Sequence, residues 1–382
     1  MFRNAKRMGR WIAVALAIGL FSSSLAMAKK PPTLPPDDDT PPYTFVDLLG
    51  LPAADFLQSD AHAVSEPDAN GALFVAGNSR DAGKFYPVAW SVEADGSFSE
   101  PLDLGGPAIK MPADANNAGI VVTSSGHVFV PPYLDAQELP MGDAANAVRV
   151  YASAINNHDQ IVGWIIYDGE PTGYGKGALW QLVDGNVPDD PVILEDFYPP
   201  GATSFIPKAI SETGVMAGNL EDIAIAAVAR FQGSELQIDP LGTVPGFTWS
   251  GADAISSDGE WVTGTSRNLE GPSQAFLFST STAGLVGLVG LAGAERNSFA
   301  WDVNTAGHVV GTSDTGEGRY SMTAVLWRDG QVFDLNTLTD AGNKAHLAIP
   351  KAINDAGHIV GLVDYSRPIS EAHGYLLIPN GE

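Results

Sequence analysis

Histidine is the residue type in this chain best suited to bind a metal ion or to move a proton near neutral pH. His308 and His358 are the most suggestive pair, because each follows the glycine of the same repeated turn in neighbouring repeats. A residue placed by repetition more often belongs to the turn or the next strand than to a metal site. We therefore predict structural roles for both and assign no metal ligand. The seven histidines are His62, His127, His158, His308, His346, His358 and His373.

Paired carboxylates are a second source of chemistry. A glycosidase or lyase needs two acids at a defined separation, and Glu195-Asp196 and Glu221-Asp222 supply neighbouring acids. Acidic turns are common in this chain, so we predict that both pairs are solvated loop residues. The sequence contains neither Gly-x-Ser-x-Gly nor His-Glu-x-x-His, the signatures of a hydrolase nucleophile and of a zinc protease. We therefore predict no catalytic residue.

The overall charge excludes some partners. The 382 residues include 45 acidic and 20 basic ones, for a formal net charge of −25. Such a surface repels phosphate backbones and anionic lipid, so nucleic acid is not a predicted partner. The absence of cysteine excludes disulfides and thiolate chemistry. Asp- and Asn-rich turns offer oxygen ligands for Ca²⁺, but no EF-hand or calcium nonapeptide is present. We predict no cofactor and keep Ca²⁺ as the alternative.

The N-terminal segment predicts export. Met1–Arg10 is basic, Trp11–Leu25 is apolar and then small, and Ala26-Met27-Ala28 fits a cleavage site. The apolar run is shorter than the roughly 20 residues of a membrane span. Residues 1–28 are thus predicted to be a signal peptide and residues 29–42 a Pro-rich acidic linker. We expect an exported protein, extracellular or periplasmic, without a membrane span in its mature part.

A repeat occupies the rest of the chain, residues 43–382. Its clearest copies read Ala-Ile-Asn-Asp-Ala-Gly-His-Ile-Val-Gly at 352–361 and Asp-Val-Asn-Thr-Ala-Gly-His-Val-Val-Gly at 302–311. The Asn or Ser opens a predicted type I turn that Gly closes three residues later. We call this polar residue the anchor. The anchors are Ser65, Asn116, Asn156, Ser211, Ser256, Asn304 and Asn354.

Each repeat predicts four strands. A small-residue strand precedes the anchor, and an apolar strand follows it. A third strand ends in an aromatic residue, as in Ala178-Leu179-Trp180, and Phe231 is predicted to occupy the same place in the fourth repeat. A fourth carries Asp-Leu, as in Phe333-Asp334-Leu335. Four strands per unit of about 50 residues are typical of a β-propeller blade. Small residues suit the crowded innermost strand, and the aromatic residue suits the core between blades.

The two ends of the chain predict a closed ring. The last repeat lacks a fourth strand, whereas Tyr43–Leu51 lies before the first repeat and aligns with residues 331–338 at the Asp-Leu pair. The N-terminal strand can therefore complete the last blade, which leaves only short edges. We predict an all-β, seven-bladed propeller. Six blades are the alternative, because the second repeat is eroded.

These motifs resemble those of the HAF-repeat extracellular proteins of bacteria. The resemblance rests on Ala-Ile-Asn-x-x-Gly-x-Ile-Val-Gly, Ala-x-Leu-Trp and Asp-Leu, and is best at residues 149–195 and 298–380. The His-Ala-Phe of the family name is absent; Gln274-Ala275-Phe276 is close to it. The resemblance implies export and a repeat fold, and it implies no established activity.

The predicted function is a non-catalytic binding or interaction scaffold for an unknown protein or glycan at one propeller face. The alternative is a secreted carbohydrate-active enzyme with acids at the mouth of the channel. A cluster of acids there would favour the enzyme, and a mouth of small residues would favour the scaffold. The segments predicted to shape the binding face are Asp168–Lys176, Asn219–Ile225, Arg267–Gln274 and Asp314–Tyr320.

Overall fold

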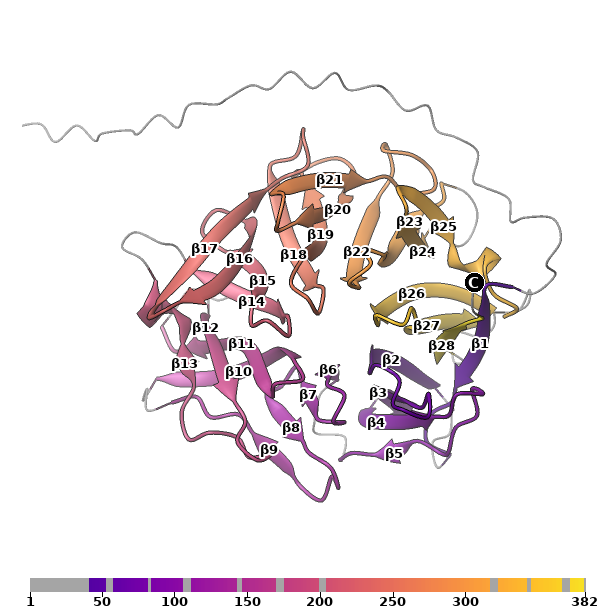
Figure 1. Ribbon diagram of the computed structural model, residues 1–382, viewed down its shortest axis with the longest axis horizontal. Helices are drawn as coiled ribbons and strands as arrows, with labels where there is room; N and C mark the ends of the chain where they lie inside the picture. Colours follow the sequence, from indigo (N-terminus) through magenta and orange to yellow (C-terminus); the bar gives the residue numbers. More distant parts are fainter. Residues whose placement is uncertain are drawn as a thin grey trace, which may run out of the picture. The chain divides into compact units, whose positions relative to one another are not determined.

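Seven four-stranded antiparallel sheets form blades around a central axis (Figure 1). This computed structural model describes residues 41–52, 58–81, 84–105, 111–142, 146–169, 175–198, 204–316, 322–341, 345–365 and 372–380, all within one compact unit. The seven-bladed prediction is confirmed, and six blades is wrong, because the eroded second repeat forms a complete sheet. The predicted signal peptide and linker residues 29–40 lie outside the described residues.

The first four blades follow the chain in order. Blade one contains β2 (Gln58–Val64), β3 (Leu73–Asp81), β4 (Lys84–Val92) and β5 (Leu102–Asp103). Blade two contains β6 (Pro112–Ala115), β7 (Val121–Thr123), β8 (His127–Phe129) and β9 (Ala136–Glu138). Blade three contains β10 (Ala147–Ile155), β11 (Gln160–Tyr167), β12 (Lys176–Gln181) and β13 (Val192–Ile193), followed by the 3-10 helix η1 (Leu194–Phe197). Blade four contains β14 (Phe205–Ile210), β15 (Met216–Leu220), β16 (Ile225–Gln232) and β17 (Glu235–Gly242).

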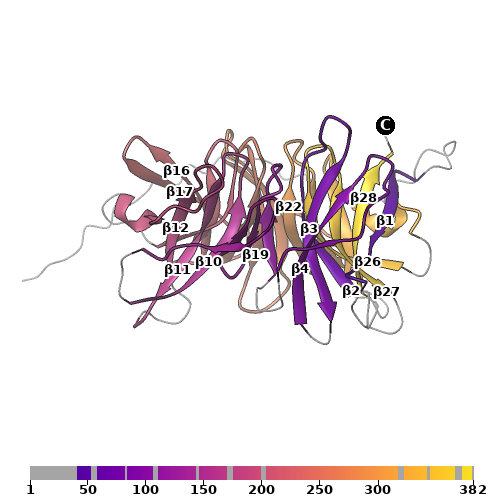
Figure 2. The ribbon, with the colours of Figure 1, turned by 90° about the horizontal axis from the view of Figure 1, so that it is seen from below.

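The last three blades close the ring. Blade five contains β18 (Trp249–Ile255), β19 (Trp261–Arg267), β20 (Gln274–Ser279) and β21 (Gly284–Leu288). Blade six contains β22 (Ser298–Val303), β23 (Val309–Asp314), β24 (Met322–Arg328) and β25 (Gln331–Asp334), followed by the 3-10 helix η2 (Leu335–Thr337). Blade seven contains β26 (Ala345–Ile353), β27 (Ile359–Tyr365), β28 (His373–Pro379) and β1 (Tyr43–Leu48). Seen from the side, the strands run between two faces that carry the turns and loops (Figure 2).

The anchor turns form as predicted. In blades two to seven the backbone N–H of the third residue after the anchor donates to the anchor carbonyl, at 2.9 to 3.2 Å. That third residue has a positive φ in every case: it is Asp159 at 60° in blade three and glycine in the other five. Glycine adopts this conformation without steric cost, and Asp tolerates it better than most residues. The motif therefore fixes where the first strand of each blade ends.

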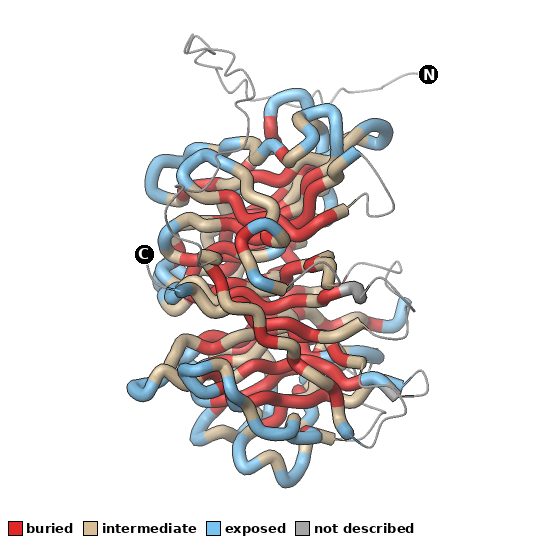
Figure 3. The backbone as a smooth tube through the Cα atoms, turned by 90° about the vertical axis from the view of Figure 1, so that its right-hand side faces the viewer, coloured by how far each residue is buried: buried red, intermediate tan, exposed pale blue. Residues whose placement is uncertain are grey.

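The predicted aromatic core lies between blades. Trp90, Trp180 and Trp327 are at most 4% exposed. The indole N–H of each donates to a carbonyl just beyond the fourth strand of the preceding blade, at 2.9 to 3.0 Å. Buried residues concentrate along the strands, and exposed ones on the connecting segments (Figure 3). In blade four the register puts Ala229 at this position, and the predicted Phe231 is 37% exposed instead.

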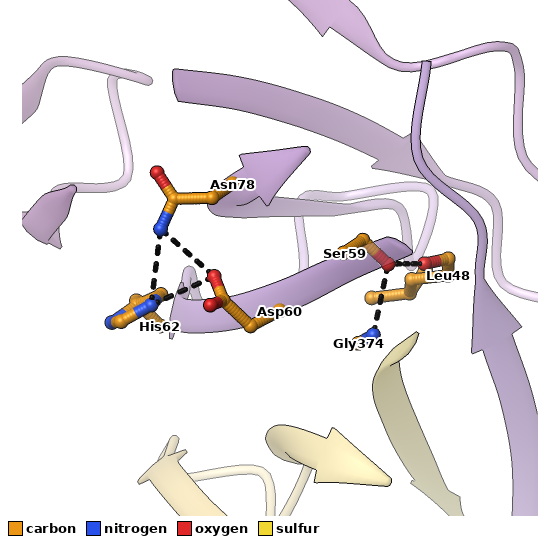
Figure 4. Close-up of polar contacts among 6 residues, drawn as sticks. All are labelled: Leu48, Ser59, Asp60, His62, Asn78 and Gly374. Atoms are coloured by element: carbon orange, nitrogen blue, oxygen red, sulfur yellow. Dashed lines mark hydrogen bonds and ion pairs between the residues drawn. The ribbon is translucent and has the colours of Figure 1, made fainter. Parts of the chain in front are cut away.

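The N-terminal strand closes the ring. β1 pairs with β28 from Tyr43 opposite Pro379 to Leu48 opposite Gly374. The Ser59 hydroxyl, on the first strand of blade one, donates to the Leu48 carbonyl and accepts from the Gly374 N–H at 2.9 Å (Figure 4). Ser250 and Ser298 join the third and fourth strands of the preceding blade in the same way. β1 therefore occupies the position of an ordinary fourth strand.

Candidate functional site

One side chain per blade is projected from the innermost strand by a β-bulge. The pairing of first and second strands shifts register in all seven blades, each time skipping the residue three positions before the anchor. The first strands lie nearest the axis (Figure 1). Each skipped residue is partly or fully exposed, and its neighbours on the strand are small or polar. We call these residues the bulge ring: His62, Ala113, Ser153, Lys208, Asp253, Trp301 and Lys351. The ring contains six residue types in seven positions, with lysine in two of them.

Glycine on the second strand makes room for the bulge. A Cβ on Gly163 would lie 1.9 Å from the Tyr151 carbonyl oxygen, and one on Gly311 would lie 2.0 Å from that of Phe299. Real Cβ atoms do not approach an oxygen so closely, and backbone cannot move aside as a side chain can. The same close approach occurs at Gly77, Gly218, Gly264 and Gly361. In these six blades the glycine leaves the space that the bulge needs, whereas blade two forms its bulge opposite Thr123.

Lys208 and Asp253 form the charged side of the ring on blades four and five. The Lys208 ammonium lies 4.2 Å from the centre of the Trp164 ring, an attractive cation–π arrangement. Burial lowers the pKa of Lys208, while the charges of Glu221 and Asp253 oppose that shift. Burial also raises the pKa of Asp253 to about 7, although Lys208 acts in the other direction. Asp253 keeps some exposed surface, but the protein atoms around its carboxyl group disfavour the charged form.

A second charged group spans blades six, seven and one. The Lys351 ammonium lies 5.0 Å from the centre of the Trp301 ring, and burial lowers the pKa of Lys351 against the attraction of Asp60. Asp60 accepts hydrogen bonds from His62 at 2.9 Å and from Asn78 at 2.8 Å (Figure 4). Burial alone would raise the pKa of Asp60, but these two partners lower it overall. Asp60 is therefore a carboxylate already paired within its own blade.

An aliphatic collar lies next to the bulge ring, towards the anchor turns. The residue directly before each anchor lines a cavity of about 360 Å³ on the axis. Since the bulge residues lie two positions further from the turns, they are on the opposite side of this collar. The collar residues are Val64, Ala115, Ile155, Ile210, Ile255, Val303 and Ile353.

The acids at the rim of this cavity join neighbouring blades. The Glu212 carboxylate accepts hydrogen bonds from the backbone and the side-chain amide of Asn157, at 3.1 and 2.7 Å. Glu66 accepts from the Asp355 N–H at 2.6 Å. Asp355 in turn accepts from the Thr305 N–H at 2.8 Å and from a serine hydroxyl at 2.6 Å. The carboxylates at this mouth have structural partners.

Two further acids strap adjacent first strands together. Asp114 accepts from the N–H of Ile155 in the next blade at 3.0 Å, and Asp302 accepts from that of Ile353 at 2.8 Å. Burial raises the pKa of Asp114 to about 6 and that of Asp302 to about 7, against these hydrogen bonds. Both residues hold the ring together at the collar.

The structure separates the predicted histidines. His62 belongs to the bulge ring, whereas His308 and His358 follow their turn glycines as predicted. His358 Nδ1 lies 3.2 Å from the Asn354 side-chain oxygen, and burial lowers the pKa of His358 to about 4. Over the described ranges, no group of three or more His, Cys, Asp or Glu residues could hold a metal ion.

The predicted acidic pairs do not belong to the bulge ring. Glu195 lies in η1 and forms an ion pair with Lys176 at 2.8 Å. Glu221 and Asp222 lie in the turn between β15 and β16, where burial raises the pKa of Glu221. The charge of Glu221 opposes the lowering of the Lys208 pKa.

The four longer segments join second to third strands. They are therefore at the opposite end of the blades from the anchor turns and the collar cavity. Asn219–Ile225 and Arg267–Gln274 are fully described, whereas residues 170–174 and 317–320 of the other two lie outside the described residues. The bulge ring lies between this loop face and the collar.

Sequence reasoning missed the bulge ring. The signal was present: three positions before each anchor the residue type varies freely, while the positions on either side are Ala, Pro or Asp in every blade. A variable position inside an otherwise uniform small-residue strand indicates a side chain that leaves the blade packing.

Comparison with known proteins identifies the fold. No family model matches the chain, and no curated protein matches it by sequence. An oligogalacturonate lyase in complex with manganese matches with a TM-score of 0.54 and 11% identity, over 88% of this chain and 96% of its own. YCF48 bound to a D1 peptide matches with a TM-score of 0.51 and 11% identity, over 90% and 98%. A puromycin hydrolase matches with a TM-score of 0.50 and 12% identity, over 84% of this chain and 54% of its own.

At these identities the likeness shows the fold alone, and the chain is a seven-bladed β-propeller. None of the helical segments within the described ranges is long and apolar enough to cross a membrane.

Proposed function

We propose that this protein is an exported, non-catalytic scaffold that binds a small ligand in its central channel, at the bulge ring. The observation that carries the proposal is the same β-bulge in all seven blades, with six different residue types at the bulge position. Bulges commonly redirect a side chain next to a functional site, and packing between blades does not need residues as unlike as His62, Asp253 and Trp301. A repeated backbone geometry that carries different side chains is suited to recognising a ligand.

The rim acids support binding over catalysis. A hydrolase needs carboxyl groups free to exchange protons or to attack substrate. Glu66, Glu212 and Asp355 instead accept hydrogen bonds that hold neighbouring blades together. Export is supported by the signal-peptide pattern of residues 1–28 and by the resemblance to HAF-repeat proteins.

One observation favours the carbohydrate-active enzyme. Asp253 faces the channel with a pKa raised to about 7 by burial, and a carboxyl group with such a pKa is suited to general acid catalysis. The enzyme would use Asp253 as the acid and a second channel group as its partner. The test below therefore includes a search for products.

The scaffold is tested by filling the channel. Ala113→Trp and Ser153→Trp place a large ring at the two smallest bulge positions, and Val148→Trp, at an exposed position of the same β10 strand, is the matched control. The mature chain, residues 29–382, is screened by thermal shift against glycans, peptides and organic acids, with mass spectrometry of each mixture. We expect at least one ligand to raise the melting temperature, both channel variants to abolish that rise, and no product to form.

Two results would overturn the proposal. Conversion of a glycan that Asp253→Asn abolishes would establish the enzyme. Binding that survives both channel-filling variants would place the site elsewhere. N-terminal sequencing of secreted protein should give Lys29 as its first residue, and retention of residues 1–28 would contradict export.

A further inference from the structure

Two lysines of the bulge ring lack a counter-charge at close range. Among the described residues, neither the Lys208 nor the Lys351 ammonium has a carboxylate within ion-pair distance; each lies over a tryptophan ring. Asp60, the acid that attracts Lys351, is already paired with His62 and Asn78. A partly buried ammonium without a partner is costly, so packing gives no reason for these two residues.

The fold does not require a lysine at the bulge position. Blades two and three place Ala113 and Ser153 at the equivalent bulge position, and blade six places Trp301 there. The protein as a whole is strongly acidic, with a net charge of −25. Lys208 has Asp253 as a charged neighbour in the ring, whereas Lys351 is the complement of a negatively charged group that arrives with a ligand.

The tryptophan beside Lys351 adds an apolar requirement. Trp301 is 36% exposed, although large aromatic side chains are normally buried in a folded protein. One of its faces is covered by Lys351. A ligand that presents a ring or an apolar body would cover the remaining surface of Trp301 while its negative group reaches a lysine.

We infer that the bulge ring binds an organic carboxylate with a ring-shaped or apolar body, its carboxylate held by Lys351 and its body packed on Trp301, which Lys351 contacts. This inference rests on the proposed function and specifies the ligand of the same site. A carboxylate accepts the N–H donors of an ammonium in a charge-assisted hydrogen bond. The ligand carboxylate would thus supply the counter-charge that the lysine ammonium lacks within the protein.

The experiment measures binding of matched charged and uncharged probes to the mature chain. Glucuronate and benzoate are titrated by calorimetry beside glucose and benzamide. We expect at least one carboxylate to bind and its uncharged counterpart not to bind. Lys351→Met should weaken carboxylate binding at least tenfold.

Lys176→Met is the matched control. Lys176 also lies near an aromatic ring, 5.5 Å from the centre of Tyr167, but it has its own ion-pair partner in Glu195 and lies on the third strand of blade three. This variant should leave the affinity unchanged. Without ligand, Lys351→Met should melt no lower than the wild type, because it removes a desolvated charge and keeps the apolar stem.

The outcomes separate this inference from the proposed function. If glucose or benzamide binds as well as its charged counterpart, and Ala113→Trp abolishes that binding, the channel scaffold stands and the carboxylate inference falls. The inference also falls if neither carboxylate binds, or if Lys351→Met binds as the wild type does. If a carboxylate binds but neither the lysine nor the channel-filling variants weaken it, both proposals fall.

Discussion

Gly163 shows how a single missing side chain permits the architecture of the channel. Its hydrogen takes the place where a Cβ would lie 1.9 Å from the Tyr151 oxygen and 2.9 Å from the Cα of Ala152. Both neighbours are backbone and cannot rotate away. The bulge at Ser153, and with it the direction of that side chain, therefore depends on glycine across the strand pair.

Gly163→Ala should lower the free energy of unfolding by about 3 kcal/mol, the upper range for overpacking. The measurement is chemical denaturation followed by tryptophan fluorescence. Gly251→Ala is the control, because its nearest neighbour to a new Cβ is the Asn219 side chain at 3.5 Å; it should change stability by less than about 0.5 kcal/mol. Equal midpoints for the two variants would contradict the steric account.

His358 contributes a pH dependence that can be isolated. Its folded pKa of about 4 lies below the usual value of 6.5 because the ring is buried. As the pH falls below 6.5 the unfolded chain takes up a proton first, so stability is lost progressively down to about pH 4. The largest loss from this one group is roughly 3 kcal/mol.

His358→Gln should remove that loss. Glutamine is the natural residue at the equivalent position of blade three, Gln160, and should fit. The difference in unfolding free energy between variant and wild type should therefore shift in favour of the variant as the pH falls from 7 to 4. His158→Gln, at an exposed turn position, controls for the loss of a histidine as such. Parallel curves for His358→Gln and the wild type would disprove this role.

At the scale of the element, the anchor turn does two things. Each Asn anchor accepts hydrogen bonds from its own turn, and its side-chain amide donates to the carbonyl of the next anchor, as Asn354 does to Ser65 at 2.7 Å. The Ser anchors accept from their own turns, as Ser211 and Ser256 do at 3.0 and 2.9 Å, but a hydroxyl is too short to bridge blades as well. The choice of Asn or Ser thus sets which blade boundaries carry this extra bond.

Asn354→Ser should cost about 1 kcal/mol, the typical net contribution of one hydrogen bond, because the turn survives and the bond to Ser65 is lost. Asn354→Ala loses the turn bonds too and should cost more. Thermal unfolding ranks the three proteins, with wild type highest, Ser next and Ala lowest. A serine variant as unstable as the alanine variant would show that the bridge between blades contributes nothing.

The elements also show what sequence reasoning could reach. The anchor turns and the small-residue strands follow from local chemistry, because Asn-x-x-Gly specifies backbone angles directly. The position of Phe231 was wrong because register is a property of two strands, and in blade four it brings Ala229 to the core position. The bulge was missed for the same reason: no residue type encodes it, since six blades form it opposite glycine and blade two forms it opposite Thr123.

At the scale of the whole molecule, closure was predictable because the missing strand and the surplus strand share the Asp-Leu pair. The position of the proposed binding site was less predictable. The composition indicates an acidic protein, and only the arrangement of the seven bulges shows that Lys208 and Lys351 occupy equivalent positions on the innermost strands. A property of the ring as a whole has no counterpart in any single repeat.

Removal of β1 tests the ring as a whole. A chain that begins at residue 50 lacks Tyr43, Val46 and Leu48, each at most 8% exposed, together with the bond from Ser59 and the contact of Asp47 with His373 at 3.0 Å. Burial of three such side chains is worth several kcal/mol, so the melting temperature should fall by about 10 °C or more. A chain that begins at residue 41 is the control and should melt with the full-length mature protein. Because blade seven would then present the unpaired edge of β28, a peptide of residues 43–51 should restore part of the loss when added in excess. If the chain from residue 50 melts within about 2 °C of the control, β1 does not stabilise the closed ring. The proposed channel site, which needs seven blades in fixed positions, would then lose its structural support.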